Sequence, residues 1–366
     1  MSEYSVSDVA VAEYTVPTEQ PEADGTLAWD ETVVVVVRPR LEGGVTGLGF
    51  AYGSSAVTAL VRDELAPLLH GLDCRDTAAA WLAMVRSIRN LGRPGIASMA
   101  IAAVDIALWD TKARAMQQPL HRVLGSVRDA VPVYGSGGFT SYSDEQLVEQ
   151  LRGWVDAGIP RVKMKIGTDR GASWLRDVER VRTVRDALGA DVELFVDANG
   201  AYDRKQALRL GELFAAEFGV TWFEEPVTSD DLEGLAMLRG TLPIDVTAGE
   251  YGYTIEYFEA MLAAGAVDVL QADVSRCAGV TEWLRVAGVA AAHHIPFSAH
   301  CGPSLHAHVA AVPPNLRHIE WFHDHVRIDS LLFEGALQPV DGVLRFSDRP
   351  GLGLSLRPDA ERWRSG

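Results

Sequence analysis

Three carboxylates each follow an apolar run that is typical of a β-strand. They are Asp197, Glu224 and Glu250, and the runs before them succeed one another at a spacing that leaves room for a helix and two loops. Carboxylates from neighbouring parallel strands would meet at one edge and form a hard oxygen site that suits Mg²⁺. The alternative is that these are helix-capping or salt-bridged acids, which are common at strand ends. The spacing favours the metal site.

Two lysines precede the acids. Lys163 and Lys165 lie two positions apart in one apolar run, so on a strand both side chains leave the same face. Burial and a neighbouring positive charge lower the pKa of a lysine, and a lysine with a lowered pKa can act as a general base. Salt bridges to nearby acids are the equally weighted alternative.

Further polar residues end later strands of the same series. Asp273 and His300 can form a carboxylate–histidine pair, in which the acid sets the ring tautomer and raises its basicity. Glu320 lies on the last strand, where it can stay protonated and donate a hydrogen bond to developing negative charge. An ordinary solvated acid is the alternative for Glu320.

After residue 130, apolar runs recur at regular intervals, and these runs predict the strands that position the polar residues. Strands are predicted to begin near Val131, Arg161, Val192, Thr221, Ile244, Asp268, Ile295 and His318, at intervals of roughly 23 to 31 residues. Eight strands with intervening helices predict a TIM-type barrel, with an open doubly wound sheet as the alternative. In such a barrel the carboxyl ends of the strands gather the catalytic residues at one mouth.

The first third of the chain has a different pattern. Strands are predicted from Val6 to Tyr14 and from Thr32 to Pro39, with a polar segment from Thr15 to Asp30 that we interpret as a mobile flap. Helical periodicity follows up to residue 124. We predict an α+β capping domain over residues 1–125, a barrel domain over 126–330, and a tail over 331–366 that folds back on the capping domain.

Composition limits the function classes. The 366 residues carry a formal net charge of −17, which argues against nucleic acid and anionic membranes as partners. The three cysteines form no CxxC pair and predict neither a disulfide framework nor a thiolate zinc site. Neither a secretory signal nor an apolar run of membrane-spanning length is visible, so we expect a cytoplasmic protein.

Taken together, the motifs resemble those of the enolase superfamily, and within it the mandelate racemase-like subgroup. The resemblance covers nearly the whole chain. The matching segments are Lys163-Met164-Lys165, Val196-Asp197-Ala198-Asn199, Trp222-Phe223-Glu224-Glu225-Pro226, Ala248-Gly249-Glu250, Asp273 with Ala278-Gly279-Val280-Thr281, His300 and Glu320.

The resemblance implies a modified (β/α)₇β barrel with an α+β cap and abstraction of the proton α to a substrate carboxylate. It implies Mg²⁺ held by Asp197, Glu224 and Glu250, with Lys165 as base on one face of the substrate. It also implies that the Asp273–His300 pair serves the opposite face and that Glu320 stabilises the enediolate. Lys163 and Asn199 are expected to bind the substrate.

The reaction expected by resemblance is dehydration of a sugar acid to a 2-keto-3-deoxy acid. The alternatives are a racemase or epimerase of a 2-hydroxy acid and a non-catalytic metal-binding barrel. We expect a small carboxylate substrate and a homo-oligomer. Residues 47–53 lack the glutamate that some relatives carry in the capping loop, and residues 15–30 contain no arginine, so the specificity stays open. Trp29 and Tyr52 are candidate lid contacts, with capping-domain core as the alternative.

Overall fold

The computed structural model describes residues 2–366. It begins with an antiparallel sheet of order β1-β2-β3, formed by Val6–Ala23, Ala28–Leu41 and Gly49–Gly53. The valine run of β2 forms a strand because β-branched side chains pack well on a pleated surface. Its alternate residues divide between two cores: Val34 and Val36 join the barrel-side cluster, and Val35 and Val37 join the cluster beneath the capping helices.

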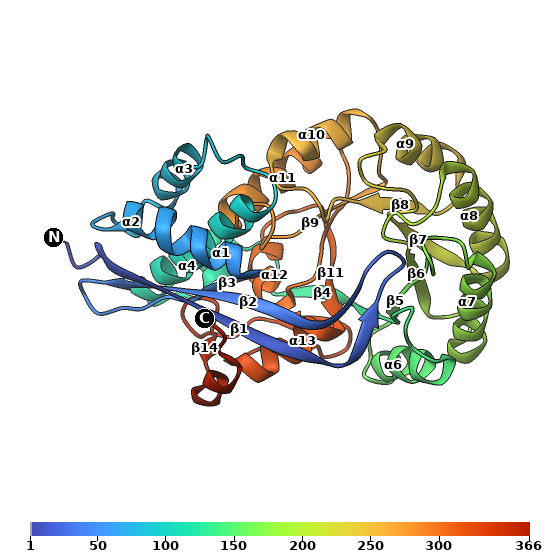
Figure 1. Cartoon of the computed structure of the whole chain (residues 1–366), viewed down its shortest axis with the longest axis horizontal. Helices are drawn as coiled ribbons and strands as arrows, with labels where there is room; N and C mark the ends of the chain where they lie inside the picture. Colours follow the sequence, from blue (N-terminus) through green and yellow to red (C-terminus); the bar gives the residue numbers. More distant parts are fainter. Residues whose placement is uncertain (1) are drawn as a thin grey trace.

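The polar segment between the first two strands is not the separate flap that the sequence predicts. β1 and β2 continue to pair through it, with a register shift between Pro17 and Glu22, so only residues 24–27 form the turn. Pairing between β1 and β2 satisfies the backbone N–H and C=O groups of this segment, and the polar composition of the segment does not reveal that pairing. Figure 1 shows the long hairpin crossing from the cap to the barrel. A Cβ on Gly25 would lie 2.6 Å from the Ile166 carbonyl oxygen, so the tip packs backbone to backbone on the barrel mouth.

Helices cover one face of this sheet. Glycine at position 49 lets the central helix approach β3, because a Cβ there would lie 2.3 Å from the backbone nitrogen of Ala107. The helical elements of the cap are α1 (Ser55–Leu60), η1 (Val61–Leu65), α2 (Ala66–Leu69), α3 (Thr77–Ser87), α4 (Ile96–Ala115) and α5 (Leu120–Leu124). This arrangement confirms the predicted α+β cap.

A closed barrel follows the cap. Its parallel strands pair in chain order, and β11 pairs with β4 to close the ring. The strands are β4 (Ala130–Gly137), β5 (Arg161–Lys165), β6 (Glu193–Asp197), β7 (Val220–Glu224), β8 (Asp245–Ala248), β9 (Val269–Ala272), β10 (Phe297–Ala299) and β11 (Leu316–Phe322). The predicted barrel is therefore confirmed, and the open sheet is wrong.

Seven helices connect the eight strands of the barrel in the described chain and form its outer layer (Figure 1). They are α6 (Asp144–Asp156), α7 (Trp174–Leu188), α8 (Arg204–Phe218), α9 (Leu232–Thr241), α10 (Ile255–Ala263), α11 (Val280–Ala292) and α12 (Pro303–Ala310). The order β4 to β11 with these connections is the (β/α)₇β pattern.

The C-terminal part touches both halves of the molecule. It comprises α13 (His323–Leu332), β12 (Phe333–Glu334), β13 (Val343–Arg345), β14 (Ser355–Leu356) and η2 (Pro358–Trp363). The carbonyl of Gly366 accepts a hydrogen bond of 2.9 Å from the Glu13 amide of β1, as a returning tail requires. β13 also pairs antiparallel with β4 of the barrel, which the sequence pattern does not indicate. The predicted domain limits stay a prediction.

Two expectations from composition can be compared with the structure. Cys74, Cys277 and Cys301 are buried and free. Within residues 2–366, no helix is both long enough and apolar enough to cross a membrane.

Candidate active site

Strand register brings the predicted acids together. Lys165 pairs directly with Asp197, and Asp197 pairs with Glu224, so the last residues of β5, β6 and β7 form one row. Glu250 follows β8 after Gly249, whose φ of +136° suits glycine. One oxygen of each of the three carboxylates lies within 4.8 Å of the others, and all three side chains are buried.

Buried donors orient two of these carboxylates. Asp197 Oδ1 accepts a hydrogen bond of 2.9 Å from the backbone N–H of Asn199. Glu224 Oε2 accepts hydrogen bonds of 2.9 Å from Trp222 Nε1 and 3.0 Å from Gln271 Nε2. These bonds leave the remaining oxygens facing a common point. Donors that fix the ligands of a metal in this way are usual around metal sites.

The third carboxylate carries an unsatisfied oxygen. Glu250 is 3% exposed, and its Oε2 makes no hydrogen bond in the described part of the chain. A buried acceptor without a donor is costly unless a cation or water satisfies it. The three carboxylates offer hard oxygen ligands without a thiolate or imidazole, which is the donor set that Mg²⁺ prefers. The residues present therefore fit a magnesium ion.

Both lysines are paired with these acids. Lys165 Nζ lies 2.5 Å from Asp197 Oδ2, and the fully buried Lys163 bonds Glu224 and lies 2.8 Å from Glu320 Oε1. Burial lowers the pKa of each lysine, but the facing carboxylates outweigh it and raise both pKa values above the usual range. The lowered lysine pKa that the sequence predicts is thus wrong for this arrangement, because the ion pairs dominate.

The predicted histidine–carboxylate pair is present. His300 Nδ1 lies 2.9 Å from Asp273 Oδ2, and its Nε2 lies 3.5 Å from Glu250 Oε2. Burial raises the pKa of Asp273, but its hydrogen bond with His300 and the charges around it lower the pKa below the usual range. In the closed ring, His300 follows β10 and Lys165 ends β5, so the strands with the three acids lie between them. The two groups therefore flank the acids from opposite sides.

Glu320 differs from its predicted protonation state. Its Oε1 accepts a hydrogen bond of 2.6 Å from Ser136 Oγ, and its Oε2 accepts one of 2.7 Å from the Cys301 amide. Burial raises the pKa of Glu320, but Lys163 and the other cations outweigh it and hold the pKa well below the usual range. The carboxylate is therefore an ionised acceptor in this structure and not the protonated donor that the sequence predicts.

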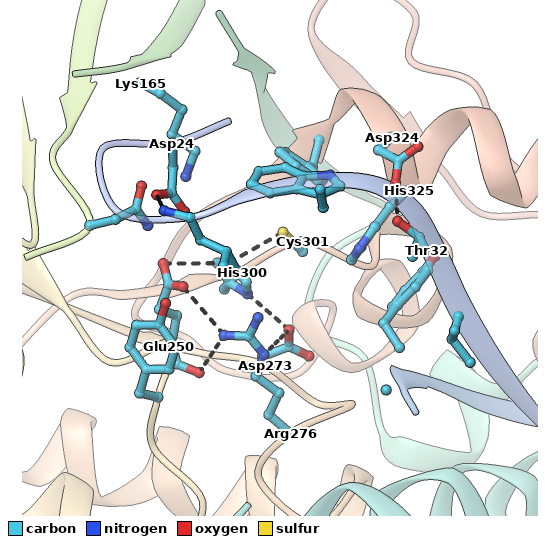
Figure 2. Close-up of a pocket in the computed structure, with 18 of the residues that line it drawn as sticks. Asp24, Thr32, Lys165, Glu250, Asp273, Arg276, His300, Cys301, Asp324 and His325 are labelled. Atoms are coloured by element: carbon cyan, nitrogen blue, oxygen red, sulfur yellow. Dashed lines mark hydrogen bonds and ion pairs between the residues drawn. The ribbon is translucent and has the colours of Figure 1, made fainter. Parts of the chain in front are cut away.

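A cavity of about 390 Å³ opens over this cluster (Figure 2). Lys165, Glu250 and His300 line it together with Asn199, whose Oδ1 is buried without a partner in residues 2–366. The direct substrate contact of Lys163 stays a prediction. Its side chain is enclosed by acids and does not line the cavity.

The cap completes the walls of the cavity. Trp29 of β2 and Tyr52 of β3 both line it, as expected for lid contacts. Trp29 packs edge to face on Phe139, with ring centroids 5.5 Å apart, and Tyr52 stacks on His325 at 3.4 Å. The hairpin and the barrel mouth therefore enclose the site jointly.

Sequence reasoning missed three supporting residues. Arg276 Nη1 donates hydrogen bonds of 3.1 Å to the Glu250 carbonyl and 3.3 Å to Glu250 Oε1. Gln271 and Trp222 each precede a predicted site residue by two positions, so the strand period places them on the same inward face. That spacing is the signal that could have identified both donors.

Comparisons with known proteins agree with this geometry. Residues 146–360 match the family described as "Enolase C-terminal domain-like", and residues 7–125 match the "Mandelate racemase / muconate lactonizing enzyme, N-terminal domain". The chain is 33% identical over 341 residues to L-talarate/galactarate dehydratase of Salmonella typhimurium, covering 91% of this chain and 83% of that protein. It is 32% identical over 346 residues to arabinonate dehydratase of Saccharolobus solfataricus, covering 90% of each.

Solved structures show the same similarity. A mandelate racemase/muconate lactonizing enzyme-like protein from Rubrobacter xylanophilus is 50% identical, with a TM-score of 0.95 over 99% of this chain and 100% of that chain. The Salmonella typhimurium dehydratase solved with Mg and L-lyxarohydroxamate is 30% identical, with a TM-score of 0.91 over 98% and 93% of the two chains.

Fold, site and family matches together define an enzyme of the enolase superfamily. Within that superfamily, the chain belongs to the mandelate racemase subgroup, whose relatives here include sugar-acid dehydratases and racemase-like proteins.

Proposed function

We propose that this protein is a Mg²⁺-dependent sugar-acid dehydratase. The observation that carries the proposal is the placement of Lys165 and His300 on opposite sides of three converging carboxylates, with Lys165, His300 and Glu250 lining one cavity. Two relatives that are at least 32% identical are named sugar-acid dehydratases, which supports dehydration as the outcome.

The metal would be held by Asp197, Glu224 and Glu250. A bound Mg²⁺ would supply positive charge that stabilises an anionic intermediate, and by taking up the carboxylate oxygens it would weaken the ion pair that keeps Lys165 protonated. The buried Oε2 of Glu250, which accepts no hydrogen bond within the described residues, supports this assignment. Relatives solved with magnesium support it as well.

Lys165 is the proposed base. Its neutral amine takes the proton from the α-carbon, and the electrons of the C–H bond move into the substrate carboxylate to form an enediolate. The Lys165 ammonium formed in this step brings positive charge close to those oxygens, and a unit charge at about 4 Å contributes about 4 kcal/mol at an effective dielectric of about 20. Asn199 lines the same cavity, and its side-chain amide is proposed to bind the substrate.

His300 is the proposed acid. Its imidazolium gives a proton to the β-hydroxyl, the C–O bond breaks with the electron pair leaving on water, and the resulting enol becomes the 2-keto-3-deoxy acid. Asp273 fixes the ring through the bond of 2.9 Å to Nδ1, which leaves Nε2 toward the cavity. Glu320 acts by holding Lys163 in place, through the contact of 2.8 Å.

The same two groups support a second candidate, epimerisation of a 2-hydroxy acid. A group on each side of the α-carbon can remove the proton from one face and return it to the other. The flanking positions of Lys165 and His300 favour this candidate. Formation of 2-keto acid separates the two reactions, because epimerisation releases none.

The test combines two readouts on a library of sugar acids with Mg²⁺. Exchange of the α-proton in D₂O reports abstraction, and the semicarbazide assay reports 2-keto acid. Lys165→Ala and His300→Ala should each lower dehydration at least about 10²-fold. Mg²⁺ affinity, from titration calorimetry, should stay close to that of the parent protein. Full dehydration by His300→Ala would remove the acid role from His300.

A library without exchange and without 2-keto acid would overturn the proposed function and favour a non-catalytic barrel. Glu250→Ala is the control for the metal site. It should weaken Mg²⁺ binding, which the two base variants should not do.

A further inference from the structure

The cavity walls differ in charge. Lys165, Glu250 and His300 lie toward one side in Figure 2, and Asp324 and His325 lie toward the other. Lys165 and Arg276 are the lysine and arginine side chains that line the cavity in the described chain. Both already bond acids of the catalytic cluster, at 2.5 Å for Lys165 with Asp197 and 3.3 Å for Arg276 with Glu250.

Three further acids line the cavity, and Figure 2 labels the first of them, Asp24, on the side of Lys165. Asp24 lies at the hairpin tip, where Oδ1 accepts hydrogen bonds of 2.8 Å from the Leu27 amide and 3.0 Å from Thr26 Oγ1. These donors hold the Asp24 carboxylate in place at the cavity mouth.

The second acid, Asp324, is held from behind. Its Oδ1 lies 2.6 Å from Arg327 Nη2, and its Oδ2 accepts a hydrogen bond of 2.6 Å from Thr32 Oγ1. Arg327 also donates to the Pro17 carbonyl and does not line the cavity. Its charge is thus committed to Asp324 and is not offered to a ligand.

The third acid, Glu31, has no such compensation. Its side chain makes no hydrogen bond or ion pair with any residue of the described range 2–366. Like Trp29, Thr32 and Val33 of β2, it lines the cavity, whereas its neighbour Asp30 does not.

The histidine of this wall, His325, does not offset the negative charge of the acids. Burial lowers the pKa of His325 to about 4, so its ring is neutral at neutral pH. Leu27, Trp29, Val33 and Phe322 add apolar surface to the lining, and the hydroxyls of Thr32 and Tyr52 donate hydrogen bonds to Asp324 and Asp329. A group bound against this wall therefore meets acidic, apolar and hydroxyl-bearing side chains of the described chain.

We propose that the substrate is a monocarboxylic sugar acid whose far end is uncharged, selected by the acids Glu31 and Asp324 on the wall away from the carboxylate cage. The inference rests on the proposed function, which places the reacting carboxylate beside Lys165. A second carboxylate at the far end would face like charges without a free cation to neutralise it. A hydroxymethyl or methyl terminus meets no such repulsion.

The test compares matched acids. All configurations of the five- and six-carbon aldonic acids and of the corresponding aldaric acids are assayed with Mg²⁺ for 2-keto acid and for α-proton exchange. The best aldonic acid should exceed the best aldaric acid in kcat/KM by at least about tenfold, which corresponds to about 1.4 kcal/mol of repulsion.

A pair of variants assigns the preference to the wall. Glu31→Lys should lower the ratio of aldonic to aldaric kcat/KM by at least about fivefold, because it places a cation in the cavity lining. Asp30→Lys changes the net charge equally at a neighbouring position that does not line the cavity, and the ratio should stay as in the parent protein.

The outcomes separate the two proposals. An aldaric acid that reacts as well as or better than every aldonic acid overturns the inference and leaves the proposed function standing. Failure of every acid to exchange or dehydrate overturns the proposed function, and the inference falls with it. Equal shifts in Glu31→Lys and Asp30→Lys would show a general charge effect and overturn the role of the wall.

Discussion

Replacing Gln271 with leucine tests how the carboxylate cage is oriented. Gln271 is fully buried, and its Nε2 donates a hydrogen bond of 3.0 Å to Glu224 Oε2. A hydrogen bond to a charged group contributes about 1.5–3 kcal/mol, and leucine cannot supply it. Because Trp222 keeps donating to the same oxygen at 2.9 Å, we expect the lower end of that range. The Kd for Mg²⁺ should rise about tenfold, within the range of about 10–100-fold typical of such supporting residues.

Titration calorimetry with Mg²⁺ measures this effect directly, with urea unfolding as the check on stability. Thr247→Val is the matched control on the neighbouring strand β8. The Thr247 hydroxyl is buried and, within the described residues, has no hydrogen-bond partner, so its loss should leave the Mg²⁺ affinity unchanged. A Kd in Gln271→Leu within about twofold of the parent value, at equal stability, would refute the orienting role.

Two further predictions concern stability. Burial beside Asp324 raises the pKa of Glu22 from 4.5 to about 8, so the folded state keeps a proton that the unfolded chain releases. The free energy of unfolding should therefore fall as the pH rises from about 4.5 to about 8, by up to about 5 kcal/mol. In urea denaturation, Glu22→Gln should flatten this slope and the exposed control Glu19→Gln should not; an unchanged slope in Glu22→Gln would reject the assignment. Gly49→Ala should lower the free energy of unfolding by at least about 3 kcal/mol, because its Cβ would lie 2.3 Å from the backbone of α4. Gly153→Ala within α6, whose Cβ would meet no atom of residues 2–366 within 4 Å, should raise it by about 0.5–1 kcal/mol, and equal effects of the two alanines would contradict the packing argument.

The barrel could be predicted because its signals are local. A short, largely apolar run that ends in an acid and is followed by a turn-forming residue such as asparagine, glycine or proline indicates a strand end without knowledge of its neighbours. Asp197 and Glu224 end β6 and β7 as predicted. The closed ring orders β4 to β11 in the sequence in which the runs occur.

The long hairpin could not be predicted in this way. Residues 15–30 are polar and contain prolines, which by local composition is typical of a loop. Their strand structure depends on pairing between β1 and β2 and on packing at the barrel mouth, as with Gly25 against Ile166. Gly25 and Ile166 are far apart in sequence, so the polar composition of the segment does not report that contact.

The charge states of the two lysines and of Glu320 could not be predicted from the sequence either. Lysines at 163 and 165 can be bases or ion-pair partners, and the choice depends on which carboxylates lie within a few ångströms of Nζ. Glu320 similarly became an ionised acceptor because closure of β11 on β4 places it beside Ser136, 184 residues earlier in the chain.

The sequence by itself determined which chemical groups stand at the strand ends and in what order, because strand periodicity and strand ends are properties of short segments. Only the tertiary structure decided which oxygen faces which donor, which lysine lines the cavity, and which acids form its far wall. Those relations arise when the barrel closes and the hairpin of the cap packs over it, since electrostatic energies change over distances that only the folded chain sets.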